Sequence, residues 1–238
     1  MFKGVLHVHS VYSDGDETLD RLIEIFRQSG MAFAAVSDHA EVFDDIRMHR
    51  YVEHCQMLSR GNFMVIPGLE FAFPGGGIHI LGYGITKRIY ASDMEKLVDG
   101  IHDAGGIAVL AHPPAGCTNM IAPIKAKLDG IEVWNGRYDG VHAPRADSFQ
   151  LFRRIRATNF KATAFGGVDL HKAGQAQRPI YVEAAAETLT KDAIMSSLKN
   201  GKFTVRGANI RIPATGELTF IQELAIAVKQ PLCRRWAG

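Results

Sequence analysis

One unit recurs through the first half of the chain: a helical pattern closed by glycine and followed by a short apolar run. Residues 19–30, 49–61 and 93–105 carry apolar side chains three and four positions apart, and they end at Gly30, Gly61 and Gly105. The runs 31–39, 62–70 and 106–113 follow directly. Runs that are almost wholly apolar are typical of strands covered on both faces. This alternation predicts an α/β fold with a mainly parallel sheet and helices outside it.

The rest of the chain adds strands and one break in the rhythm. Residues 130–136 and 161–171 are predicted strands, and residues 147–159 are a predicted helix between them. Residues 71–84 hold two apolar runs joined by the glycines at 75–77, which favours a hairpin over a crossover. Residues 203–220 look like short strands and turns. We predict a single domain over 1–238, with a core at about 4–207 and a weakly patterned extension at 208–238.

Composition narrows the classes of partner. The 238 residues carry a formal net charge of +2, which is too small to favour a long nucleic-acid track or a membrane surface. Cys55, Cys117 and Cys233 show no C-x-x-C spacing, so a cytoplasmic protein without disulfides or a cysteine zinc site is expected. Neither a signal peptide nor an apolar run of membrane-spanning length is found, so no membrane partner is expected. The oligomeric state stays open.

Metal-binding side chains recur where the apolar runs end. They are His7, His9, His39, Glu70, His112, Asp169 and His171; His79 begins the second arm of the hairpin, and Asp14 follows on the first loop. Because side chains alternate along a strand with a period of two, His7 and His9 are predicted to point to one face. Six histidines at equivalent positions predict one pocket at the carboxyl ends of the strands. The other four, His49, His54, His102 and His142, are interpreted as ordinary helix or loop residues.

Together these motifs resemble the PHP family, the polymerase and histidinol phosphatase superfamily. The stretches "HVHSVYSDG", "SDH", "GLE", "HILGYG", "AHP", "IEVWNG" and "GVDLH" carry the resemblance, which runs from about residue 4 to 207. It implies a distorted, TIM-like barrel of seven β/α units that holds up to three divalent metals at the carboxyl ends of its strands.

The resemblance also implies a ligand set. His7 and His9 would hold one metal together with Glu70 and Asp169, and Glu70 would bridge to a second metal. The second metal would also be bound by His79 and His112, and Asp14, His39 and His171 would complete a third site. A donor set of imidazoles and carboxylates without thiolate suits zinc, manganese or iron, so two to three such ions are the expected cofactors.

This chemistry predicts a metal-dependent phosphoesterase. Three divalent ions exceed the charge of three carboxylates by about three, which favours an anionic substrate. In this hypothesis a hydroxide that bridges two metals attacks the phosphorus of a small phosphomonoester or nucleotide-type substrate. A mononucleotide or short oligonucleotide would also fit. The candidate catalytic residues are Glu70, Asp169, His39 and His171, and the group that protonates the leaving oxygen stays open. The candidate phosphate-binding residues are Arg206, Arg137, Lys172 and Asn135.

Two other interpretations remain. An amidohydrolase-type hydrolase of carbon–nitrogen bonds also opens with H-x-H on a strand, but that design often uses a bridging lysine where this chain has Glu70. A non-catalytic, metal-binding PHP domain is the third possibility, although none of the nine expected ligands is missing. Asp38 and Ser37, beside His39, are equal candidates for orienting the site.

Overall fold

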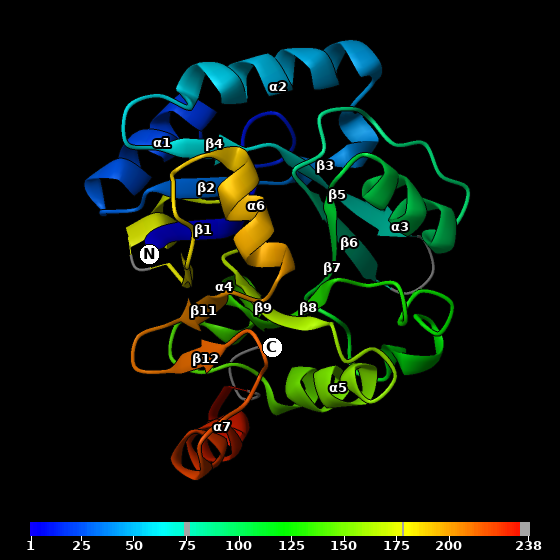
Figure 1. Ribbon diagram of the computed structural model, residues 1–238. Coiled ribbons are helices and arrows are strands. Elements are labelled where there is room, and N and C mark those ends of the chain that lie inside the picture. Colours follow the sequence, from blue (N-terminus) through cyan, green and yellow to red (C-terminus); the bar gives the residue numbers. More distant parts are fainter. Residues whose placement is uncertain (74–76, 178, 234–238) are drawn as a thin grey trace.

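The computed structural model describes residues 1–73, 77–177 and 179–233 (Figure 1). The strands are β1 (Phe2–Val8), β2 (Phe33–Val36), β3 (Asp38–His39), β4 (Met64–Ile66), β5 (Gly68–Phe73), β6 (Ile78–Tyr83), β7 (Ile107–Ala111), β8 (Gly130–Asn135), β9 (Thr163–Gly167), β10 (Tyr181–Ala184), β11 (Phe203–Arg206) and β12 (Arg211–Pro213). The α-helices are α1 (Leu19–Gln28), α2 (Asp45–Leu58), α3 (Met94–Asp103), α4 (Gly136–Asp139), α5 (Ala146–Arg156), α6 (Lys191–Lys199) and α7 (Phe220–Cys233). Three short 3-10 helices complete the set: η1 (Ala40–Val42), η2 (Cys117–Asn119) and η3 (Ala173–Gln177).

The strands form two mixed sheets of six strands each. One has the order β12-β11-β10-β1-β2-β4 and the other β3-β5-β6-β7-β8-β9. The predicted α/β class is therefore confirmed. The predicted seven-unit barrel is not, because the hydrogen-bonded ladders of the described residues do not close into one ring.

The two sheets meet where β1 lies beside the segment that follows β9. The His9 amide donates to the Leu170 carbonyl at 2.9 Å, and the Val168 amide donates to the Leu6 carbonyl at 2.9 Å. An isolated parallel bridge joins Val8 to Leu170. This junction brings the carboxyl end of the first predicted strand to that of the last, although they belong to different sheets.

The glycine-rich connection explains why the second sheet is mixed. A parallel crossover needs about a dozen residues, so the short link between β5 and β6 can only make an antiparallel pair. β6 pairs antiparallel with both β5 and β7, as the predicted hairpin requires. Residues 75 and 76 of the hairpin lie outside the described residues. Because β6 runs backwards, its first residues lie at the same edge as the last residues of β7.

Amphipathic helices cover the outer faces of the sheets, with α1 and α2 on one side and α5 on the other (Figure 1). Helix α1 buries Leu22, Ile23 and Phe26, and its amino end is capped by Thr18, whose hydroxyl accepts from the Arg21 amide at 3.2 Å. The expected positive φ is found at Gly30, at 75°. None of the described helices has the length and apolar character that a membrane crossing requires.

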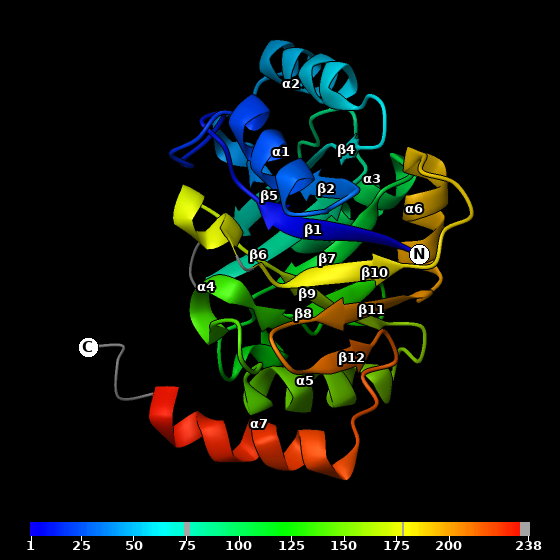
Figure 2. The ribbon, with the colours of Figure 1, turned by 90° about the vertical axis from the view of Figure 1, so that its left-hand side faces the viewer.

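The chain after residue 180 was predicted least well. β10 and α6 lie in a stretch with no predicted element: β10 is a strand of the first sheet, and α6 packs against β10 and β4. The extension beyond residue 207 forms β12, which pairs antiparallel with β11, and then α7, which lies beside α5 (Figure 2).

Candidate metal centre

Glu70 occupies the middle of the cluster of predicted ligands. One carboxylate oxygen, Oε1, lies 2.8 Å from His79 Nδ1 and 3.0 Å from His112 Nε2. The other oxygen, Oε2, lies 3.3 Å from His7 Nε2 and 3.2 Å from His9 Nε2. The two oxygens therefore face two different groups of imidazoles, which is the arrangement that a carboxylate bridging two cations needs. Glu70 itself lies inside β5 rather than at the predicted strand end, because β5 continues to pair with β6.

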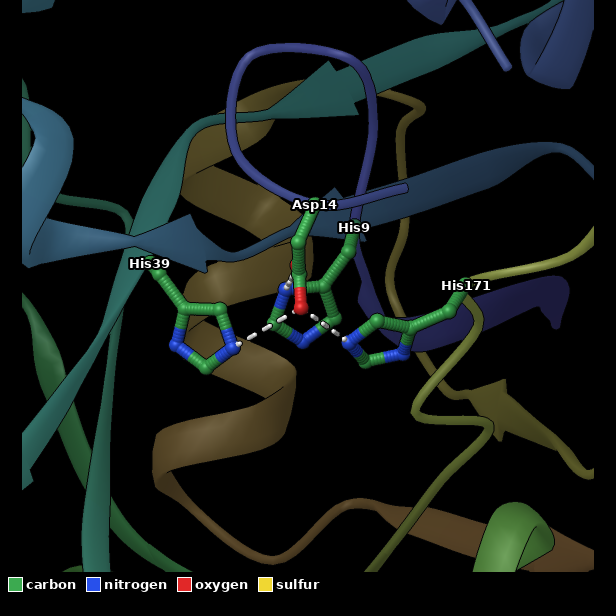
Figure 3. Close-up of side chains that lie close together, drawn as sticks. All are labelled: His9, Asp14, His39 and His171. Carbon is green, nitrogen blue, oxygen red and sulfur yellow. Dashed lines mark ion pairs between the residues drawn. The ribbon is translucent and has the colours of Figure 1, made fainter. Parts of the chain in front are cut away.

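Asp14 gathers a second group of donors at the rim. Its carboxylate lies between the rings of His9, His39 and His171 (Figure 3). Oδ2 is 3.1 Å from His171 Nε2 and 3.6 Å from His39 Nε2, and Oδ1 is 3.5 Å from His9 Nδ1. One ligand atom from each of these four residues lies within 4.8 Å of the others. The His39 ring also approaches Glu70, with Nδ1 at 3.5 Å from Oε2, so the two groups are continuous.

Asp169 joins the groups from the last strand. Its Oδ1 lies 3.7 Å from Nε2 of both His7 and His9 and 3.2 Å from His171 Nδ1, and its Oδ2 lies 3.8 Å from His112 Nε2. The structure thus brings together all nine residues that the sequence analysis singled out as ligands. They come from β1, β3, β5 and β6, and from the segments that follow β1, β7 and β9.

Backbone strain is concentrated in this cluster. Among the described residues, the non-glycine positions with positive φ are His7 at 60°, His112 at 24° and Asp169 at 52°. Each such conformation costs of order 1–3 kcal/mol and persists where surrounding contacts enforce it, often at functional sites. His7 also lies at a register shift between Leu6 and Val8. His7 and His9 therefore reach the same pocket through an irregular strand end, not through the simple alternation that the sequence suggested.

Several buried imidazole nitrogens have no hydrogen-bond partner among the residues that the structure describes. They are Nε2 of His7 and both ring nitrogens of His9, and both residues are fully buried. An unpaired buried polar atom costs of order 1–3 kcal/mol, and native structures rarely leave one without a reason. Imidazole nitrogens that point at carboxylate oxygens a little over 3 Å away are suitable ligands for divalent cations once they carry no proton. The donor set therefore fits the metal ions that the sequence predicted.

Burial and charge shape the protonation of the cluster. Burial lowers the pKa of His9 to about 4, which leaves its ring neutral. Burial also disfavours the charged form of His7, but the neighbouring carboxylates, Glu132 first, outweigh it and raise its pKa well above the ordinary value. Burial would raise the pKa of Glu70, yet the charge on His7 and hydrogen bonds from the histidines hold it well below the usual range. Cations that bind at this site would displace the proton that the neighbouring carboxylates stabilise on the His7 ring.

Glu132 is a site residue that the sequence analysis missed. It lies in β8 at 1% exposure, and its Oε1 accepts from His7 Nδ1 at 2.8 Å. Its Oε2 accepts from the His112 amide at 2.9 Å and from Asn135 Nδ2 at 3.0 Å. A carboxylate on the far nitrogen of a ligating histidine fixes the tautomer and orients the ring. The available signal was one acidic residue between the apolar residues Ile131 and Val133 of the predicted strand.

Asp38 orients the loop that carries Asp14. Its carboxylate accepts from the Ser10 amide at 2.8 Å, the Ser10 hydroxyl at 2.9 Å and the Ser13 hydroxyl at 2.7 Å. The Ser37 hydroxyl, the alternative candidate, is buried and has no hydrogen-bond partner in the described part of the chain. Of the two residues beside His39, Asp38 therefore makes the contacts that hold the first loop in place.

The predicted phosphate-binding residues fall into different surroundings. Asn135 is 1% exposed and donates to Glu132, so in this structure it holds carboxylates rather than facing solvent. Arg137 reaches the pocket, with Nη1 at 2.7 Å from His171 Nδ1 and 3.7 Å from Asp169 Oδ1. Lys172 is exposed beside His171. Arg206 is engaged by a competing partner, because its Nε donates to Glu183 on the adjoining strand at 2.7 Å.

The sequence places the chain in a family that fits this geometry. The family model described as the PHP domain matches residues 6–191, so the chain belongs to the PHP domain family. No curated protein matches the sequence.

Solved structures with a similar fold extend the comparison. A two-domain protein from Bacteroides vulgatus, described as containing a predicted PHP-like metal-dependent phosphoesterase, is 17% identical over 96% of this chain and 69% of its own, with a TM-score of 0.67. A proposed metal-dependent phosphoesterase from Bifidobacterium adolescentis is 18% identical over 82% of this chain and 94% of its own, at 0.51. An amidohydrolase from Chromobacterium violaceum with bound sulfate and no metal is 19% identical over 73% of this chain and 89% of its own, with a TM-score of 0.55. At these identities the likeness concerns the fold.

Proposed function

We propose that the protein is a metal-dependent phosphoesterase acting on a small phosphorylated substrate. The observation that carries the proposal is the convergence of six imidazoles and three carboxylates at one edge of the sheets, where buried nitrogens of His7 and His9 have no partner among the described residues. Two to three ions of zinc, manganese or iron suit this donor set. Bound there, such ions supply activated water near neutral pH and counter the charge of a phosphate.

The charge of the site favours an anionic substrate. Three divalent ions would exceed the charge of Glu70, Asp14, Asp169 and the buried Glu132 by about two. This surplus of positive charge is smaller than the value of about three expected from the sequence, because Glu132 adds a fourth carboxylate to the site. It still attracts a phosphate group more strongly than a neutral amide. Glu70 would hold two ions together, and Glu132 would keep the His7 ring turned so that Nε2 faces them.

Arg137 and His171 form a pair that would respond to a bound cation. If His171 binds a cation through Nε2, which lies 3.1 Å from Asp14 Oδ2, its proton must sit on Nδ1. Nδ1 would then donate to the Asp169 carbonyl at 3.1 Å and could no longer accept from Arg137. The freed guanidinium, 44% exposed, would be available to grip a phosphate oxygen. His39 and His171 line the rim and are the candidates for protonating the leaving oxygen.

The test is turnover by the purified protein loaded with manganese or zinc. Release of p-nitrophenolate from p-nitrophenyl phosphate or from bis-p-nitrophenyl phosphate, lost in the Glu70→Gln variant, is the expected result. The same preparation assayed on an amide panel tests the amidohydrolase alternative. Amide cleavage without hydrolysis of either phosphate ester would overturn the proposal. Full metal loading without turnover on any of these substrates would favour a non-catalytic metal-binding domain.

A further inference from the structure

A groove of about 510 Å³ lies next to the metal centre, and none of the nine candidate metal ligands lines it. One wall is the loop between β1 and α1, through Val11 and Tyr12, which lies between the ligands His9 and Asp14. The other wall is the segment that leaves His39, through Val42 in η1 and the outward face of the first turns of α2. Both walls therefore begin at residues of the candidate metal centre.

The groove presents apolar surface that no other part of the described chain covers. Val11 is 49% exposed, Val42 48% and Ile46 66%. These three aliphatic side chains come from three separate segments and line one hollow. Exposed aliphatic side chains are ordinary when scattered singly, but gathered in a hollow beside a reactive site they are typical of a ligand-binding surface.

The groove also holds an uncommitted positive charge. Arg50 is exposed and makes no hydrogen bond, ion pair or ring contact with any residue that the structure describes. Its neighbour Arg47 is already engaged, because its guanidinium donates to the Tyr12 carbonyl and lies 5.6 Å from the centre of the Phe43 ring. Asp44, the one acidic residue of the lining, caps the Arg47 amide at 2.7 Å. Arg50 is therefore the cation available to a ligand.

The wall that carries Tyr12 is held in place before any ligand binds. The Tyr12 hydroxyl lies 3.2 Å from His54 Nδ1, and His54 Nε2 lies 2.9 Å from Asp20 Oδ2. The Tyr12 ring also packs edge-on against Tyr51, with 4.9 Å between the ring centres. His54, interpreted from the sequence as an ordinary helix residue, thus ties the first loop to α2. A preformed wall lowers the ordering cost of binding.

We propose that this groove is the leaving-group subsite of the enzyme. It would take phosphate esters whose leaving group has an apolar, aryl-sized body and a distal anionic group, with the body against Val42 and Ile46 and the anion at Arg50. This inference rests on the proposed function, since it assigns the part of the substrate that lies beyond the reacting phosphate.

The experiment compares phenyl phosphate with 6-carboxy-2-naphthyl phosphate, and it measures binding of the freed leaving group, 6-hydroxy-2-naphthoate, to the metal-loaded protein by fluorescence. The variants are Arg50→Gln and, as a matched control, Arg211→Gln, which removes an exposed arginine from β12 at the far edge of the first sheet. An ion pair in a partly exposed groove predicts a loss of about fivefold. Arg50→Gln should weaken naphthoate binding by that factor. It should also lower kcat/KM for 6-carboxy-2-naphthyl phosphate, relative to kcat/KM for phenyl phosphate, by the same factor. Arg211→Gln should change neither quantity.

The outcomes separate this inference from the proposed function. Naphthoate binding that depends on Arg50, without hydrolysis of phenyl phosphate, would support the groove and count against the phosphoesterase. Hydrolysis of phenyl phosphate, with naphthoate affinity and ester preference identical in Arg50→Gln and the unaltered protein, would overturn the groove and leave the phosphoesterase standing.

Discussion

Replacing Glu132 by glutamine should weaken metal binding without unfolding the protein. The carboxylate accepts three hydrogen bonds, at 2.8 Å from His7, 2.9 Å from the His112 amide and 3.0 Å from Asn135. An amide has only one acceptor oxygen. If that oxygen serves His112 and Asn135, the amide NH2 group faces His7 Nδ1, and His7 must move its proton to Nε2, the nitrogen that points at Glu70.

The size of the effect follows from these contacts. Loss of an outer-shell partner of a ligating histidine typically costs 10- to 100-fold in metal affinity, or about 1.4–2.7 kcal/mol. The volume of the side chain is unchanged and two of its three hydrogen bonds can be kept, so the core should stay folded. We expect the loss to fall on the ion held by His7 and to leave the ion held by Asp14 bound.

The assay is a competitive zinc titration with a chromophoric chelator, with circular dichroism to verify folding. Asp129→Asn is the matched control, because Asp129 also pairs with a histidine, at 2.9 Å from His102 Nε2, and with the Ala108 amide at 2.8 Å. This control should lose stability but keep its zinc affinity. A zinc affinity of Glu132→Gln within about twofold of the unaltered protein would refute the reasoning.

Three further variants test other residues in and near the site. Glu70→Gln should lose at least one bound metal together with activity, because it removes the charge that faces two groups of imidazoles, and elemental analysis of the purified variant measures this. Asp38→Asn should weaken the binding of the ion held by Asp14 about 10- to 100-fold and leave the affinity for the other ions unchanged, because Asp38 holds the loop that carries Asp14. A stepwise metal titration measures the affinity of each site. Burial raises the pKa of Asp139 to about 6, so the folded state binds more protons than the unfolded state between about pH 4 and 6, and this carboxyl reduces stability as pH rises through that range. Urea unfolding at pH 4.5 and 7.5 gives the free energy of unfolding of Asp139→Asn minus that of the unaltered protein. This difference should be about 2 kcal/mol more favourable to the variant at pH 7.5 than at pH 4.5. The same difference at both pH values would contradict this.

The position of the predicted ligands could be read from the sequence because chemistry and strand ends coincide. His7, His39, His112 and Asp169 each follow an apolar run, and parallel strands bring their carboxyl ends to one edge. The side chains converge even though the strands belong to two sheets and β6 is antiparallel to its neighbours. His79 still reaches Glu70, because the first residue positions of a reversed strand lie at the same edge.

The missed features depend on long-range contacts that leave little local trace. Glu132 sits in a strand 125 residues from His7, and nothing in its neighbours along the chain marks it as a partner of that histidine. The positive φ of His7 arises where β1 meets the segment after β9, a junction formed only in the folded chain. Whether the ladders close into a barrel is decided by pairing between distant edges, which periodicity does not encode.

Anomalous diffraction from crystals grown with manganese or zinc tests the central assignment most directly. Two or three anomalous peaks should appear among the side chains of His7, Asp14, Glu70, His112 and Asp169, each about 2.0–2.2 Å from a histidine nitrogen or a carboxylate oxygen. Crystals with these side chains ordered but no anomalous peak between them would contradict the assignment of a metal centre.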